Sequence, residues 1–403
     1  MSEKQINRGG ITVDLNIRYQ LPRINQYLYT KADKRKIPLG GTFELTPLCN
    51  MNCRMCYIRK SPDQLQERLL TAGEWLEIAR EAGKQGLLFL LLTGGEPFLR
   101  ADFKEIYLAL HKMGFVLTIN SNGTLITEKE VSWLRDAAPM RINLTVYGAS
   151  NKTYETLCSN PRGYDQVMNA IHLLKASGIE VKLNYSLTPY NASDFYGIKK
   201  MAMEEGLFLQ ATTYMYPAIR KSMDNIGSND RLPPEDAAYY TALSHYYEYG
   251  PKQFLEGTEE IRLADECVDE AVPTEKTGRR EHIRCRAGVS TFWVTWNGIM
   301  TPCGMMNQPA ENIRGKGFEK AWEDLCSNTR KILMPEECTD CAYKKRCSTC
   351  AAMVLAETGG YEEAPEYRCR MIKSYPEACR KLREKILKKE LKEDVWRDEK
   401  ETI

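Results

Sequence analysis

The chain has 403 residues, which is long enough for two or three domains. Its hydrophobic content of 43% and charged content of 27% are ordinary for globular proteins, and its net charge of +2 implies no nucleic-acid or anionic-membrane partner. The longest strongly apolar run, residues 87–92, is far below the roughly 20 residues that span a membrane. Because the polar start MSEKQINRGG lacks the apolar segment of a signal peptide, the fourteen cysteines favour metal sites in a reducing cytoplasm over disulfides.

Residues 1–40 are polar, and we expect an irregular N-terminal extension there. From 41 to 220, short apolar strands alternate with longer amphipathic segments, which predicts βα units and a parallel sheet. The expected strands are 42–46, 87–92, 115–120, 141–146, 180–187 and 208–215. The expected helices are 72–84, 102–113, 127–136, 164–177 and 192–204. Gly114 and Gly178 fall just after expected helices, where a left-handed cap favours glycine.

Three cysteines follow the first expected strand in the segment LTPLCNMNCRMCYI. Cys49, Cys53 and Cys56 form the pattern C-x3-C-x2-C. A [4Fe–4S] cluster usually takes four thiolates, so three would leave one iron open to a small ligand. Zinc is the alternative, but it prefers four tetrahedral ligands, and no fourth Cys or His lies nearby in the sequence. The pattern therefore favours an iron–sulfur cluster.

The second expected strand ends in LLTGGEPF, which contains Gly94, Gly95, Glu96 and Pro97. With the cysteine pattern, this run resembles the radical S-adenosylmethionine (SAM) enzymes. The resemblance implies a partial (β/α)6 barrel whose active face is the C-terminal ends of the strands. It also implies that SAM chelates the open iron, that the GGEP backbone binds its amino group, and that the reduced cluster cleaves SAM to a 5′-deoxyadenosyl radical.

The same resemblance implies further contacts with SAM. They are Met55, Ser121, Asn122, Thr145 and Arg162. Met55 replaces the aromatic residue that packs on adenine in relatives, and a thioether can fill that space. Many relatives place an arginine near position 158 to meet the SAM carboxylate. Here that position is Cys158, and Arg162 is the alternative cation.

Residues 221–282 are expected to form bridging helices and a linker, and a second cysteine-rich region, 283–380, follows them. Seven of its nine cysteines form the informative pattern, and they are Cys285, Cys303, Cys338, Cys341, Cys347, Cys350 and Cys369. Two four-iron clusters would use up to eight ligands. The four cysteines between 338 and 350 alone would also suit a zinc ribbon. Residues 381–403 are expected to form a charged helix or tail.

This string of seven cysteines resembles the SPASM domain of radical SAM peptide-modifying enzymes, with one residue missing between Cys347 and Cys350. The resemblance implies a small domain with two auxiliary clusters, for three [4Fe–4S] clusters in all. The distal set would be Cys338, Cys341, Cys347 and Cys369. The proximal set would be Cys285, Cys303 and Cys350. Either Cys267 supplies its fourth ligand or a substrate thiolate binds there; Cys267 could also donate a hydrogen atom to a substrate radical.

By analogy with these relatives, the favoured function is modification of a ribosomally made precursor peptide, by a crosslink or by epimerisation. Tyr214 and Tyr216 would face the substrate channel or pack in the core. We expect a reductant such as flavodoxin or ferredoxin. Leader binding would need a separate protein or another surface of the enzyme, because 40 N-terminal residues are too few for the recognition domain of some relatives. The alternatives are formylglycine formation in a sulfatase, tetrapyrrole tailoring and a non-catalytic iron–sulfur carrier, which would need no SAM pocket.

Overall fold

A computed structural model describes the protein except for residues 1–5, 9–10, 14, 229, 270–277 and 392–403; its side chains are described for 24–258, apart from 229, and for 278–391. Its centre is a nine-stranded sheet in the order β11-β10-β9-β3-β4-β5-β6-β7-β8. Strands β3 to β8 are all parallel. They are β3 (Gly40–Glu44), β4 (Phe89–Thr93), β5 (Val116–Ser121), β6 (Arg141–Val146), β7 (Val181–Ser186) and β8 (Phe208–Thr212). These six strands form the predicted partial barrel.

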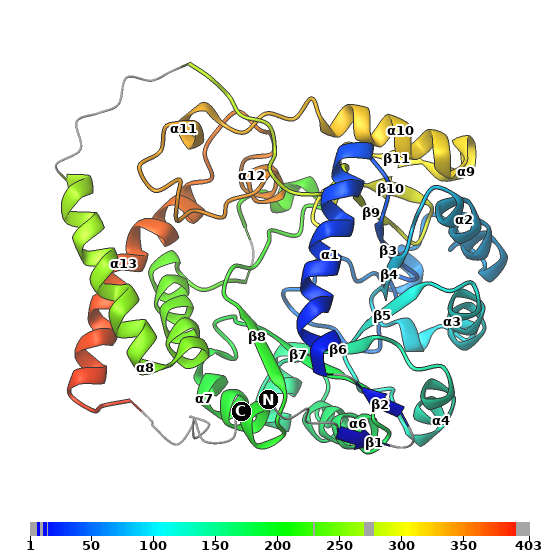
Figure 1. Ribbon diagram of the computed structural model, residues 1–403, viewed down its shortest axis with the longest axis horizontal. Helices are drawn as coiled ribbons and strands as arrows, with labels where there is room; N and C mark the ends of the chain where they lie inside the picture. The colour runs from blue at the N-terminus through cyan, green and yellow to red at the C-terminus, as the bar shows by residue number, and fades with distance from the viewer. Residues whose placement is uncertain (1–5, 9–10, 14, 229, 270–277, 392–403) are drawn as a thin grey trace.

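Helices connect these strands and lie along the outside of the curved sheet (Figure 1). They are α2 (Ala72–Lys84), α3 (Phe103–Lys112), α4 (Glu128–Asp136), α5 (Asn151–Cys158), α6 (Gly163–Ala176) and α7 (Phe195–Glu204). In α2, the buried side chains of Trp75, Ile78 and Ala82 lie three and four residues apart and so share one helix face. Trp75 packs on Phe43 of β3 with ring centroids 4.8 Å apart, which joins helix and sheet.

The structure confirms the six expected strands and five expected helices, with boundaries shifted by a few residues. Gly114 and Gly178 have φ values of 87° and 72°, as the expected left-handed caps require. Helix α5 is additional to the prediction. Its sequence, NKTYETLC, is short and mostly polar, so its helical period is weak, but tertiary packing buries Tyr154 and Leu157.

The second cysteine-rich region continues the same sheet beyond β3. Strand β9 (Thr291–Val294) pairs parallel with β3, and β10 (Ile299–Thr301) and β11 (Glu311–Asn312) follow antiparallel. The helices of this region are α9 (Ile313–Lys316), α10 (Phe318–Thr329), α11 (Glu336–Thr339) and α12 (Ala351–Thr358). A small second core forms here from Ile219, Met306, Ile332, Ala351, Ala352, Leu355 and Ala356.

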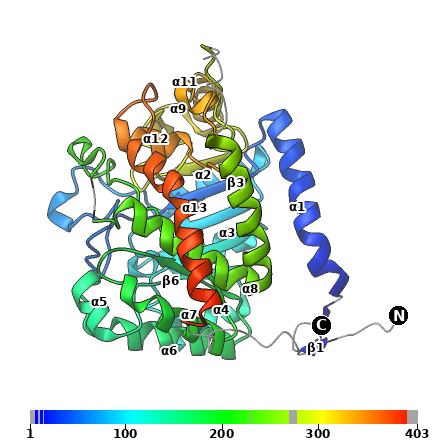
Figure 2. The same cartoon turned by 90° about the vertical axis from the view of Figure 1, so that its left-hand side faces the viewer.

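The N-terminal extension is not irregular throughout, contrary to expectation. Strands β1 (Ile6–Arg8) and β2 (Ile11–Val13) pair with each other, and α1 (Leu15–Arg35) follows (Figure 2). Pro22 and many charged residues hide the helical pattern of α1 in the sequence. Its last turns pack on the barrel, where the Tyr29 ring stacks on Phe89 at 5.8 Å.

The bridging segment contains α8 (Pro234–Asp269), which packs along α13 (Glu366–Leu387) in both ribbon views (Figure 1 and Figure 2). Helix α8 bends at Gly250, where φ is 88° and a proline follows. The polar sequence around Cys267 predicts a loop, but the structure places this residue within α8; its side chain lies outside the described residues. Much of the expected tail is likewise outside them.

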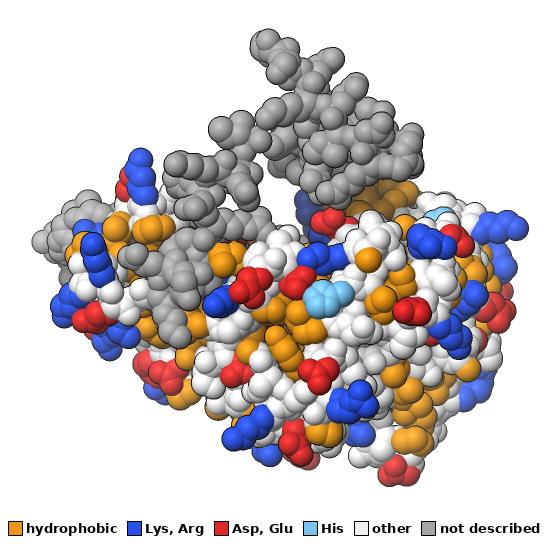
Figure 3. All heavy atoms as spheres, turned by 90° about the horizontal axis from the view of Figure 1, so that it is seen from below, with side chains coloured by type: hydrophobic (Ala, Val, Ile, Leu, Met, Phe, Trp, Pro, Cys, Tyr) orange, Lys and Arg blue, Asp and Glu red, His pale blue; other side chains and the backbone are white. Residues whose placement is uncertain are grey.

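No described helix is long and apolar enough to cross a membrane. One face of the molecule, seen from below in Figure 3, carries acidic and basic side chains interspersed with small apolar areas. This mixture agrees with the nearly balanced charge of the sequence.

Candidate cofactor site and cysteine groups

The three cysteines of the first motif lie in what we call the cysteine loop, residues 49–56, which follows β3. Cys53 is buried, whereas Cys49 and Cys56 are partly buried. Two backbone N–H groups of the loop are held by the end of α5: Asn52 donates to the Cys158 carbonyl at 2.9 Å and Arg54 to the Leu157 carbonyl at 3.0 Å. The last carbonyls of a helix have no partner within it, so α5 is well suited to anchor this loop.

The thiols of the loop already receive backbone hydrogen bonds. The N–H of Met51 donates to Cys49 Sγ at 3.4 Å, and the N–H of Arg59 donates to Cys56 Sγ at 3.3 Å. Burial raises the pKa of Cys49 to about 12, and the nearby Cys53 and Cys56 contribute to this shift. Three neighbouring thiols with N–H donors directed at sulfur suit a cluster that binds thiolates.

The GGEP run lies against the start of the cysteine loop. A Cβ atom at Gly94 would lie 2.5 Å from the Thr46 carbonyl oxygen, and one at Gly95 would lie 2.3 Å from that of Leu48. Only glycine allows this approach. The N–H groups of Gly95 and Glu96 donate to those same two carbonyls at 2.6 and 2.9 Å.

The carbonyl oxygens of Gly94 and Gly95 receive no hydrogen bond from the described residues. Oxygens of this kind can accept hydrogen bonds from an ammonium group. The shape of the run therefore suits the amino group of SAM.

The Glu96 carboxylate is fully buried and points away from solvent into the barrel wall. It accepts hydrogen bonds from Ser121 Oγ at 2.8 Å, from the Asn122 N–H at 2.8 Å and from the Phe98 N–H at 3.2 Å. Burial raises the pKa of Glu96 to about 7, although these hydrogen bonds oppose the shift. Glu96 thus ties the GGEP run, of which Pro97 begins a short 3-10 helix, to the end of β5.

Asn122 connects the end of β5 with the cysteine loop. Its Nδ2 atom donates to Asn50 Oδ1 at 3.0 Å and lies 3.6 Å from Cys49 Sγ. The structure therefore brings together the cysteine loop, the GGEP run and the Ser121–Asn122 pair, which lie far apart in the sequence.

The other three residues expected to contact SAM differ in their surroundings. Thr145 is partly buried near the end of β6, and Met55 is partly buried against the large core. Arg162 is exposed at the start of α6, and its side chain makes no hydrogen bond or ion pair with the described site residues. Cys158, at the position where relatives carry arginine, is fully buried, and hydrogen bonding with its thiol lowers the pKa of Cys53.

The seven later cysteines gather in two groups. In the distal group, burial and the nearby Cys369, Cys347 and Cys341 raise the pKa of Cys338 to about 12. In the proximal group, burial and the nearby Cys350 and Cys285 raise the pKa of Cys303 to about 11. A cavity of about 300 Å³ lies among the segments that carry these cysteines. Six of the seven line it, namely Cys285, Cys338, Cys341, Cys347, Cys350 and Cys369.

The assignment of these cysteines to a distal and a proximal set of cluster ligands stays a prediction. Among the described residues, no three His, Cys, Asp or Glu side chains are close enough together to hold a single metal ion.

A buried ion pair, which sequence reasoning missed, joins the barrel to the proximal group. Arg220 donates to both carboxylate oxygens of Glu44, at 2.7 and 2.9 Å, and to the Gly304 carbonyl at 3.0 Å. Trp293 Nε1 also donates to Glu44, which is 0% exposed. A glutamate inside the apolar strand GGTFEL was the one sequence signal that could have marked this pair.

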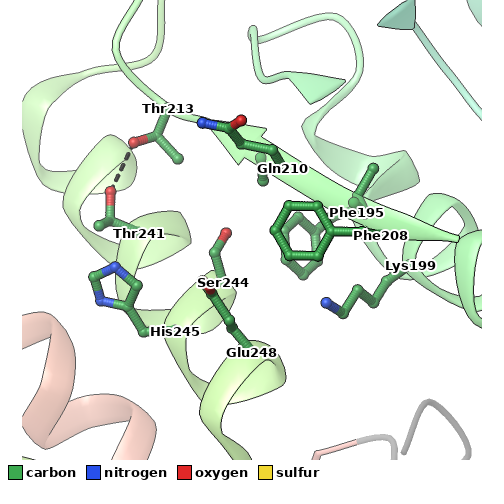
Figure 4. Close-up of a pocket in the computed structure, with 11 residues that line it drawn as sticks. Phe195, Lys199, Phe208, Gln210, Thr213, Thr241, Ser244, His245 and Glu248 are labelled. Atoms are coloured by element: carbon green, nitrogen blue, oxygen red, sulfur yellow. Dashed lines mark hydrogen bonds between the residues drawn. The ribbon is translucent and has the colours of Figure 1, made fainter. Parts of the chain in front are cut away.

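A second cavity, of about 330 Å³, lies at the free edge of β8, which ends the sheet (Figure 4). Its walls come from β8, α7 and α8, and the Phe208 side chain at its rim is 58% exposed. On the α8 side, Thr241 hydrogen-bonds Thr213 at 2.6 Å, and Ser244 and His245 lie beside them.

Curated relatives are similar to most of the chain. The AdoMet-dependent heme synthase of Methanosarcina barkeri is 27% identical over 81% of this chain and 94% of that protein. The sporulation killing factor maturation protein SkfB of Bacillus subtilis is 25% identical over 76% of this chain and 68% of that protein.

Solved structures share the fold. Streptococcus suis SuiB bound to its precursor peptide SuiA has a TM-score of 0.59, with 18% identity over 90% of this chain and 84% of that one. Native anSMEcpe with bound AdoMet and the Kp18Cys peptide has a TM-score of 0.62, with 17% identity over 87% of this chain and 99% of that one.

Residues 43–202 match the sequence model of the Radical SAM superfamily. This match covers the end of β3, strands β4 to β7, the cysteine loop and the GGEP run whose geometry suits a cluster and SAM. The chain therefore contains a radical SAM domain.

Proposed function

We propose that the protein is a radical SAM enzyme that modifies a ribosomally made precursor peptide, by forming a crosslink, such as a thioether, or by epimerisation. When bound, the cluster and SAM supply a radical that abstracts hydrogen from the substrate. The chain's own residues bind and orient these groups. Cys49, Cys53 and Cys56 would hold the cluster, and the GGEP carbonyls would hold the SAM amino group.

Further residues would complete the SAM site. Met55 would pack against the adenine, and Thr145 would contact SAM from the end of β6. Asn122 would fix the cysteine loop from the end of β5, while Ser121 would hold Glu96 in place through their hydrogen bond at 2.8 Å. Arg162 would have to turn inward from its exposed position to meet the SAM carboxylate.

The cavity beside the free edge of β8 carries the peptide proposal. An edge strand has unpaired backbone N–H and C=O groups, with which an extended peptide can pair. The C-terminal end of β8 leads to Tyr214 and Tyr216 and then to the proximal cysteines. SkfB, a relative, and SuiB, a structural neighbour solved with its precursor peptide, support this proposal.

We also propose that residues 283–380 form a SPASM domain with two auxiliary [4Fe–4S] clusters, so that the enzyme holds three. The proximal cluster would use Cys285, Cys303 and Cys350. Its fourth position would take Cys267 or a substrate thiolate. A reductant such as flavodoxin or ferredoxin would supply electrons in the cytoplasm, and a separate protein could present the leader peptide.

A Cys267→Ala variant tests the two models of the proximal site. If it keeps its full iron content and crosslinks a Cys-containing peptide normally, the fourth position is open to substrate. The loss of about four irons together with activity would instead identify Cys267 as a ligand. An intact cluster with an altered product would indicate a hydrogen-atom donor.

The main experiment combines the enzyme with short peptides encoded beside its gene. After co-expression, mass spectrometry should find a peptide that has lost two hydrogen atoms, or an epimer of unchanged mass that chiral amino-acid analysis detects. The matched control replaces Cys49, Cys53 and Cys56 with Ala. An unmodified peptide with an enzyme that still cleaves SAM would contradict the peptide proposal while leaving the radical SAM domain intact.

Tetrapyrrole tailoring is the second candidate, because AdoMet-dependent heme synthases are among the relatives of this chain. Incubation with an iron porphyrin that bears propionates, followed by mass analysis, tests this candidate.

A further inference from the structure

Tyr216 lies at the boundary between the barrel and the second cysteine-rich region. It follows β8 by four residues, and its partly buried ring packs against both the large core and the small second core. A residue in this place can connect the substrate side of the barrel to the proximal cysteines.

The Tyr216 hydroxyl is 3.7 Å from Cys350 Sγ, within hydrogen-bonding distance for sulfur. Cys303 and Cys350 pack against the same small second core as Tyr216, so the phenol lies beside the proximal group. As the two atoms stand, either could be the donor. A cysteine that ligates iron is a thiolate without a proton, so Tyr216 would then have to donate.

The neighbouring Tyr214 packs against Tyr216, but its hydroxyl has a different hydrogen-bond partner. The two rings meet edge to face at 4.9 Å with an angle of 85° between them. The Tyr214 hydroxyl donates to Glu357 at 2.5 Å, and Arg231 pairs with that carboxylate. Packing against Tyr214 therefore fixes the orientation of Tyr216. Tyr214 is also a matched control for substitution, because its own hydroxyl bonds Glu357 and not a proximal cysteine.

We propose that Tyr216 donates a hydrogen bond to the Cys350 thiolate and thereby raises the reduction potential of the proximal cluster. This inference rests on the proposed auxiliary cluster at Cys285, Cys303 and Cys350. Reduction adds negative charge to a cluster, and a hydrogen bond to a ligating sulfur stabilises that charge. Tyr216 would thus be a positioning residue that decides how readily this cluster accepts an electron from the substrate radical.

The test is an EPR redox titration of the reconstituted enzyme in a background with Cys49, Cys53 and Cys56 replaced by Ala, which removes the signal of the SAM-site cluster. A Cys303→Ala variant identifies the transition that belongs to the proximal cluster. At the midpoint potential of the unsubstituted proximal cluster, Tyr216→Phe should show a several-fold smaller reduced fraction with unchanged iron content. Tyr214→Phe should titrate as before.

An unchanged midpoint in Tyr216→Phe would overturn the inference, and so would equal shifts in both variants, which would indicate packing alone. The loss of about four irons would overturn it in favour of Tyr216 as a ligand. A proximal cluster missing even before Tyr216 is changed would instead contradict the proposed cofactor content.

A second measurement needs no variant. An exchangeable proton coupled to the reduced proximal cluster should appear in hyperfine spectra in H2O and be replaced by deuterium in D2O. Its absence would count against the hydrogen bond even if Tyr216→Phe failed to fold.

Discussion

The two cysteine-rich regions of this protein are built in different ways. The cysteine loop places three thiols within residues 49–56, next to a large apolar core. Its backbone N–H groups donate hydrogen bonds to carbonyls of α5, and Asn122 donates to it from the end of β5. The seven later cysteines extend from Cys285 to Cys369 on loops and short elements. Cys285 is exposed, and the small second core beside them contains seven buried apolar residues, three of them alanines.

The two regions therefore differ in what stabilises their folded structure. The barrel buries enough apolar surface to fold around an empty cysteine loop. A small core supplies little stabilisation, and regions of that kind commonly depend on bound metal. We therefore expect the first site to be dispensable for folding and the second to be part of folding.

The largest effect should come from the cysteine loop. Replacing Cys49, Cys53 and Cys56 with Ala should abolish cleavage of SAM to 5′-deoxyadenosine and methionine under anaerobic reduction with dithionite, because no iron would remain to bind SAM. Chromatographic analysis of the products measures this loss. The melting temperature and the auxiliary iron should hardly change, and SAM cleavage that survived in the variant would contradict the radical SAM assignment.

Iron content should then distinguish the regions. The fully reconstituted protein should bind about twelve irons, and replacing Cys338 and Cys341 with Ala should remove about four of them. Metal and sulfide analysis measures both numbers. The C-terminal region of this variant should also become sensitive to limited proteolysis, while the barrel resists. About four irons plus one zinc in the unmodified protein would favour a zinc ribbon instead.

The Glu44–Arg220 pair tests how strongly the two regions are joined. Arg220→Met should lower the free energy of unfolding by roughly 3–5 kcal/mol, because it leaves a buried carboxylate without its cation. Urea denaturation followed by circular dichroism gives the value. The double variant Glu44→Gln, Arg220→Met should lose much less than the sum of the single variants, and simple additivity would show that the pair does not couple the regions.

The smallest effect concerns Glu96 and pH. Its pKa is raised from 4.5 to about 7, so the folded state holds this proton more tightly than the unfolded state. Relative to Glu96→Gln, the stability of the protein should therefore fall as pH rises from about 4.5 to about 7, by on the order of 3 kcal/mol, and then stay level. Urea midpoints of both proteins across this range measure the difference, and parallel curves would contradict it.

Local signals in the sequence determined much of this protein. The alternation of apolar strands and amphipathic helices predicted the six-stranded parallel sheet, since the spacing of apolar residues in each segment reflects which of its faces is buried. The cysteine pattern and the GGEP run indicated the cofactor site, because three thiols and a close backbone approach are properties of short segments. Helices α1 and α5 escaped prediction, since their sequences carry weak periodicity and their helical form depends on packing.

Contacts between distant segments were decided only by the tertiary structure. Asn122 meets Cys49, Glu44 pairs with Arg220 and Tyr216 contacts Cys350 across 73, 176 and 134 positions of the chain. Residues at such separations share no local period or motif, so nothing in the sequence pairs them. They meet because the parallel strands direct their C-terminal ends to one edge, and because β9 joins the second cysteine-rich region to that same sheet.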